Sequence, residues 1–89
     1  MNAKRAETPK RTPITRAALE IAIAEAVRNT DPQCKDLIGI IVESVVPAVS
    51  GNPNWAVKGI KFGKAVRGAC STAISVCVEA LQREFEIVD

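Results

Sequence analysis

Apolar residues recur at spacings of three and four along residues 14–29, which is the period of one face of an α-helix. The stripe consists of Leu19, Ala22, Ile23, Ala26 and Val27. Just before it, Thr12 and Pro13 form a helix start, because a Thr side chain accepts a backbone N–H and Pro suits the first helical position. We therefore predict a helix from Pro13 to about Asn29.

A second helical pattern runs over residues 64–86. Its apolar seam, again at spacings of three and four, consists of Val66, Cys70, Ala73, Cys77, Leu81 and Phe85. Polar and charged residues occupy the opposite stripe. The pattern predicts a long amphipathic helix that begins at Lys64, directly after Gly63.

Between these helices, residues 37–46 carry six β-branched residues in ten and an interior glycine, Gly39. Both features favour a strand. The alternative is a helix, since Leu37, Ile41 and Val45 recur at i+4, and it would make the chain an all-α three-helix bundle. Because apolar residues occupy both parities of the strand, we expect it to be covered on both faces.

After a loop over residues 47–53, residues 55–62 have the composition of a returning strand. Trp55 and Val57 share one parity, whereas Ile60 and Phe62 share the other. A β-bulge at Gly59 explains this switch, because an extra residue redirects every later side chain. The two strands are expected to form an antiparallel hairpin.

The predicted fold is therefore α+β, with the order helix, strand, strand, helix in one domain over residues 12–89. Residues 1–11 lack apolar periodicity and are expected to form a disordered basic arm. A two-stranded sheet is marginal on its own, and a chain of 89 residues builds only a thin core. We therefore expect a homodimer that pairs two hairpins across a two-fold axis or exchanges helices.

The cysteines indicate neither a metal nor a cofactor. The chain has three Cys and no His, which is short of the four ligands of a conventional zinc site. Cys70 and Cys77 lie two helical turns apart, too far to bond, so we expect Cys34, Cys70 and Cys77 to be buried free thiols. Free thiols suit a reducing compartment, and no apolar run is long enough for a membrane span. The expected location is cytoplasmic.

Charge alternates along the chain. Cations outnumber acids in residues 1–16 and 54–67, and acids outnumber cations in the segments between and after them. The candidate contacts to nucleic acid or another anion are Lys58, Lys61, Lys64 and Arg67, with Lys10 and Arg11 of the arm. Such cations would neutralise phosphates. The alternative is charge matching between the basic segment and the acidic C-terminal stretch, within or between subunits.

Catalytic motifs are lacking. Without His the chain has no Ser-His-Asp or Cys-His arrangement and no ordinary general base near neutral pH. We expect no enzymatic activity. Trp55 and Phe62 are candidate anchors in an interface with a second copy or a protein partner. The expected function is a homodimeric protein-interaction or structural module, and the alternative is a nucleic-acid-binding protein.

The runs DPQCKDLIGIIVE, NWAVKGIKFGKAVR and LQREFEI resemble a group of small uncharacterised bacterial proteins. The resemblance covers about residues 14–88. Its most specific part is a W-A-x-K-G-x-x-F-G-x-A segment, which matches residues 55–65. It implies an Ala-rich first helix, an apolar strand, a hairpin and a final helix, and it implies no activity.

Overall fold

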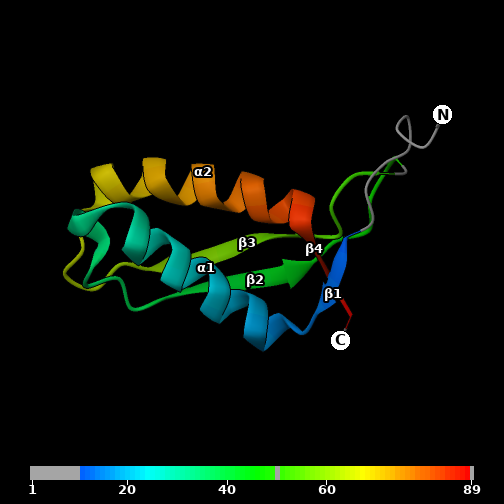
Figure 1. Ribbon diagram of the computed structural model, residues 1–89, viewed down its shortest axis with the longest axis horizontal. Coiled ribbons are helices and arrows are strands. Elements are labelled where there is room, and N and C mark those ends of the chain that lie inside the picture. The colour runs from blue at the N-terminus through cyan, green and yellow to red at the C-terminus, as the bar shows by residue number, and fades with distance from the viewer. Residues whose placement is uncertain (1–10, 50, 89) are drawn as a thin grey trace, which may run out of the picture.

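Two helices, an antiparallel hairpin and a short parallel pair of strands make up the fold (Figure 1). The computed structural model describes residues 11–49 and 51–88, so the predicted arm lies outside them except for Arg11. In chain order the elements are β1 (Thr12–Ile14), α1 (Arg16–Thr30), the 3₁₀ turn η2 (Pro32–Cys34), β2 (Gly39–Ser44), β3 (Trp55–Lys61), α2 (Arg67–Glu84) and β4 (Phe85–Ile87). The predicted α+β class is confirmed, and the all-α alternative is wrong.

The hairpin has the predicted strands and the predicted irregularity. β2 and β3 are antiparallel, and Ile41 pairs with Gly59 while the next residue, Val42, pairs with Val57. Lys58 is therefore the extra residue of a β-bulge beside Gly59. The bulge keeps Trp55 and Ile60 on the side of the core although their sequence parities differ, which is the switch that the sequence pattern showed.

The start of α1 differs from the prediction. Thr15, not Thr12, is the N-cap, and its hydroxyl accepts a hydrogen bond from the N–H of Ala18 at 3.2 Å. Residues 12–14 are extended instead and form β1, which pairs in parallel with β4. Both Thr residues suit a cap, and the long-range pairing with the end of the chain decides between them. Pro13 is tolerated because β1 is an edge strand.

The last helix is shorter at both ends than its apolar seam. Gly63 takes a positive φ of +59° and turns the chain, and α2 begins only at Arg67. At the other end Phe85 is extended and continues into β4. Cys70, Ala73 and Cys77 of the predicted seam are buried.

One core lies between the helices and one face of the hairpin. Its fully buried side chains are Trp55, Leu19, Ile23, Val27, Val42, Cys34 and Cys70. On β2, Ile40 and Val42 are buried, whereas Ile41 and Glu43 are exposed. In the single chain only one face of β2 is covered, because both helices contribute to the same layer, and the covering of its second face by a partner stays a prediction.

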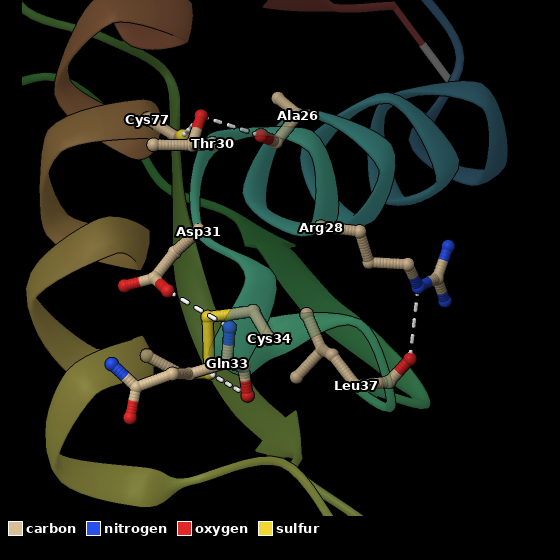
Figure 2. Close-up of a disulfide and its surroundings, with 9 residues drawn as sticks. Ala26, Arg28, Thr30, Asp31, Gln33, Cys34, Leu37 and Cys77 are labelled. Carbon is tan, nitrogen blue, oxygen red and sulfur yellow. Dashed lines mark hydrogen bonds between the residues drawn. A yellow bond between two sulfur atoms is a disulfide. The ribbon is translucent and has the colours of Figure 1, made fainter.

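A disulfide joins Cys34, the last residue of η2, to Cys70 in the first turn of α2 (Figure 2). Their Cα atoms are 5.5 Å apart. The prediction of free thiols is wrong for these two residues. It is confirmed for Cys77, which is buried and forms no disulfide. Helical spacing excluded a Cys70–Cys77 bond. It carries no information about Cys34, which lies in another element and approaches Cys70 only through the tertiary fold.

Among the residues that the structure describes, no helix is long and apolar enough to cross a membrane.

Candidate interaction surface

Trp55 lies in the protein's own core, with none of its surface exposed. Its indole N–H donates to the carbonyl of Phe85 at 3.1 Å, and its own carbonyl accepts from the side chain of Gln82 at 2.9 Å. In this position Trp55 offers no surface to a second molecule. The residue proposed as an interface anchor holds β3 to the junction of α2 and β4.

Asn54 extends the same junction. Its side-chain N–H donates to the carbonyl of Ile87, and its side-chain oxygen accepts from the N–H of Ile87, both at 3.0 Å. This two-sided bond fixes β4 beside the start of β3. Sequence reasoning gave Asn54 no role, because its partner lies 33 residues away.

Phe62, the other candidate anchor, is half-buried at the end of β3 and packs against the core. The guanidinium carbon of Arg67 lies 4.9 Å from the centre of its ring, within the range of a cation–π contact. Arg67 therefore covers the ring at the start of α2. Phe62 and Arg67 were predicted for two different roles, and the structure brings them together.

The four cations of the basic segment, Lys58, Lys61, Lys64 and Arg67, are exposed. They come from three parts of the fold, and Arg67 is the first residue of α2. Lys58 and Lys61 lie on β3, and Lys64 lies in the turn that follows. Lys64 was expected to begin the last helix, yet α2 begins at Arg67, so Gly63 and Lys64 are not at a helix N-terminus. Within residues 11–49 and 51–88, the three lysines form no salt bridge, and the pair that is formed joins Arg83 to Glu79 on α2.

The arm residue that the structure describes lies away from this segment. Arg11 donates to the carbonyls of Gln82 at 2.6 Å and Gly51 at 2.8 Å. Gln82 is in the last turn of α2, so about 20 Å of helix separate Arg11 from Arg67. Lys10 lies outside the described residues. The structure does not bring Arg11 together with the other candidate cations.

A surface that the sequence reasoning missed lies between α1 and β2. It is a groove of about 400 Å³, which we call the α1–β2 groove. Its lining residues are Ala17, Glu20, Ile21, Ala24 and Arg28 of α1, Ile38, Gly39, Ile40 and Ile41 of the strand segment, and Lys61 of β3. Its apolar residues on α1, Ala17, Ile21 and Ala24, recur at spacings of four and three, which is the signal that could have identified a second apolar face.

Two charged side chains of α1 hold the free edge of β2 along this groove. Glu20 Oε2 accepts from the N–H of Val42 at 2.9 Å. Arg28 donates from Nε to the carbonyl of Leu37 at 3.0 Å, as Figure 2 shows, and from Nη2 to the carbonyl of Ile38 at 3.1 Å. An unpaired edge strand is a template for another strand, and charged side chains block it. Here the blocking groups come from α1.

Two large apolar side chains on the walls of the α1–β2 groove are open to solvent. Ile21 is 60% exposed and Ile38 is 63% exposed. Large apolar side chains that lie together on a surface mark a site of association more often than isolated ones do. In the part of the chain that the structure describes, no group of three His, Cys, Asp or Glu side chains is placed to hold a metal ion.

Comparison of the chain with protein-family models, with curated proteins and with solved structures finds no match. The resemblance to small bacterial proteins therefore stays a prediction.

Proposed function

We propose that this chain is a non-enzymatic module that works as a homodimer and presents its surfaces to protein partners. The observation that supports it is the α1–β2 groove, whose two walls keep Ile21 and Ile38 more than half exposed in the single chain. Covering such side chains contributes about 25 cal/mol for each Å² of apolar surface removed from water. A small domain gains proportionately more from that burial than a large one.

The test is the mass of the native protein in solution. We expect light scattering coupled to size-exclusion chromatography to give about twice the chain mass of 9.5 kDa at micromolar concentration. Dilution should shift the population toward the single chain, because association depends on concentration. A mass of one chain at every concentration would contradict the proposal.

A cytoplasmic location is part of the proposal, although it no longer rests on free thiols at Cys34 and Cys70. In a reducing cytoplasm, cellular reductants would act on the Cys34–Cys70 bond. Because both cysteines are completely buried, this reaction would be slow. Alkylation of a lysate followed by mass spectrometry would measure the oxidised fraction of this pair in cells.

Nucleic-acid binding is a second candidate, supported by the exposure of Lys58, Lys61 and Lys64 and by their lack of ion pairs in the described parts of the chain. The expected behaviour is binding to labelled duplex DNA or RNA at low salt that weakens steeply as salt rises. The double substitution Lys58→Glu and Lys61→Glu should abolish it. Binding that is absent at low salt, or that survives the double substitution, would remove this candidate.

A further inference from the structure

We infer that the α1–β2 groove is the contact between the two chains of the dimer, with the groove of a second copy facing it across a two-fold axis. The inference rests on the proposed homodimer and names its interface. A two-fold interface brings the same patch of both chains together, so the patch must be complementary to itself. The charges and the side-chain sizes along the α1–β2 groove are consistent with this condition.

The charges of the groove are divided between its two ends. Arg28 binds the carbonyl of Ile38, and Lys61 pairs in the hairpin with Gly39, so both cations lie at one end. Glu20 binds the N–H of Val42 at the other end. About four residues of extended strand, roughly 13 Å, separate the two ends.

A two-fold axis through the middle of the groove reverses the second copy. The cationic end of each chain then faces the acidic end of the other, so opposite charges meet twice in the contact. Lys61 has no ion pair among the described residues of its own chain and is free to approach Glu20 of the second copy. A head-to-tail arrangement would leave one cationic end and one acidic end unmatched.

The groove also combines large and small side chains. Ile21 and Ile38 project from its walls, while Ala17, Ala24 and Gly39 have little or no side chain. Facing copies can therefore place each large side chain against small ones. Ala17, Ile21, Ala24 and Arg28 alternate spacings of four and three, which is the spacing of a seam between two packed helices.

The hydrogen bonds of β2 argue for this side-chain contact and against joining two hairpins into one four-stranded sheet. A second strand added at β2 would need the N–H of Val42 and the carbonyl of Ile38. Glu20 and Arg28 occupy both groups. The second copy is thus expected to pack on the side chains of α1 while β2 keeps its edge covered.

Substitution of Ile21 tests the inference with a matched control elsewhere. Ile21→Lys places a charge at the centre of the contact, and we expect the dimer dissociation constant to rise by at least about tenfold. Val76→Lys makes a closely similar change on α2, where Val76 is also 60% exposed, and should leave the constant unchanged. Circular dichroism and thermal melting would establish that both variants fold.

A second pair of variants tests the charge pattern without touching the apolar walls. Lys61→Glu places an acid opposite Glu20 of the second copy and should weaken the dimer severalfold, with the difference shrinking as salt rises. Lys58→Glu makes the same change on the same strand outside the groove and should have no such effect.

The outcomes separate the two proposals. A wild-type protein that is monomeric throughout removes the homodimer and the interface together. A wild-type dimer that Ile21→Lys and Lys61→Glu leave intact keeps the homodimer and overturns the groove as its contact. Dissociation by Val76→Lys alone would place the contact on α2 and likewise overturn the inference.

Discussion

Asn54 shows how one side chain can decide the position of an element far along the chain. Its amide satisfies both the N–H and the carbonyl of Ile87, and the neighbouring Trp55 binds the carbonyl of Phe85. Buried backbone groups must find partners, and the loss of one partner costs more than the bond itself contributes. The junction of α2 and β4 therefore depends on side chains from the start of β3.

We predict that Asn54→Asp destabilises the protein. The substitution keeps the shape and the acceptor for the N–H of Ile87, but it replaces the donor to the carbonyl with a second oxygen. The expected loss in the free energy of unfolding is about 1–3 kcal/mol. Urea unfolding followed by the fluorescence of Trp55 measures it. Asn52→Asp, in the exposed loop nearby, is the control and should leave stability within about 0.5 kcal/mol.

Gly63 is the second residue whose replacement has a clear expected cost. Its φ of +59° disfavours any other residue, and an added Cβ would lie 2.8 Å from Cγ1 of Ile38 and 3.1 Å from the carbonyl oxygen of Asp36. We expect Gly63→Ala to lower the free energy of unfolding by more than about 1 kcal/mol.

Gly68 supplies the control of opposite sign. It lies in the first turn of α2, where an added Cβ meets nothing within 4 Å. Gly68→Ala should raise stability, by up to about 1 kcal/mol, because Ala is the better helix former. Equal effects of the two substitutions in thermal or urea unfolding would contradict the conformational argument for Gly63.

At the level of elements, local patterns predicted what local interactions determine. The density of β-branched residues identified β2, and the change of parity at Lys58 and Gly59 located the bulge. The β1–β4 pair was not predicted, because three extended residues at each end of the chain have no periodicity of their own. The helix start at Thr15 was missed because a cap at Thr12 was equally acceptable locally.

The candidate site was harder to predict than the fold. Exposed lysines follow from a sequence with some reliability, because Lys is seldom buried. The α1–β2 groove depends on how far α1 sits from the edge of β2, and on Glu20 and Arg28 reaching across to it. No pattern within α1 reveals that distance. The spacing of its outward face shows only that a second apolar stripe exists.

We predict that the contact between Glu20 and β2 stabilises the hairpin edge. Glu20→Ala leaves the N–H of Val42 without its acceptor, and the free energy of unfolding should fall by about 1–2 kcal/mol. Chemical denaturation measures the change. The variant should also aggregate more readily on heating, because the edge becomes available to other strands.

Glu25→Ala is the matched control for this experiment. Glu25 lies on the same helix, is exposed and makes no ion pair among the described residues. Its replacement should be neutral or slightly stabilising, since Ala favours helix. If Glu25→Ala lowered stability as much as Glu20→Ala does, both effects would arise from the helix and not from the strand edge.

For the whole molecule, the Cys34–Cys70 disulfide is the interaction with the largest expected effect on stability. It closes a loop with a sequence separation of 36 and joins the middle of the chain to α2. Such a loop restricts the unfolded chain, which contributes about 3–4 kcal/mol in the chain-entropy model. A core composed mainly of Ala, Val, Ile and Leu in so short a chain makes that contribution a large part of the total.

Reduction of this bond should therefore lower the midpoint of urea unfolding markedly. Unfolding with and without reductant measures the difference, and the double variant Cys34→Ala and Cys70→Ala should show no response to reductant. Cys77→Ala, which removes the free buried thiol, should keep the full response. A wild-type protein that is equally stable in both conditions would show that the pair is not bonded in solution.

The parallel pairing of β1 with β4 has a mechanical consequence. The two strands run in the same direction near the two chain ends (Figure 1), so a force that pulls these ends apart acts along the strands. The backbone hydrogen bonds of the pair are then strained together in shear, whereas strands pulled from the same side separate one bond at a time. If the pair gives way, the disulfide still keeps the segment between Cys34 and Cys70 from being drawn out. A tether attached at both ends of this chain would therefore yield in two steps, because the residues between Cys34 and Cys70 add to the extension only after the bond is reduced.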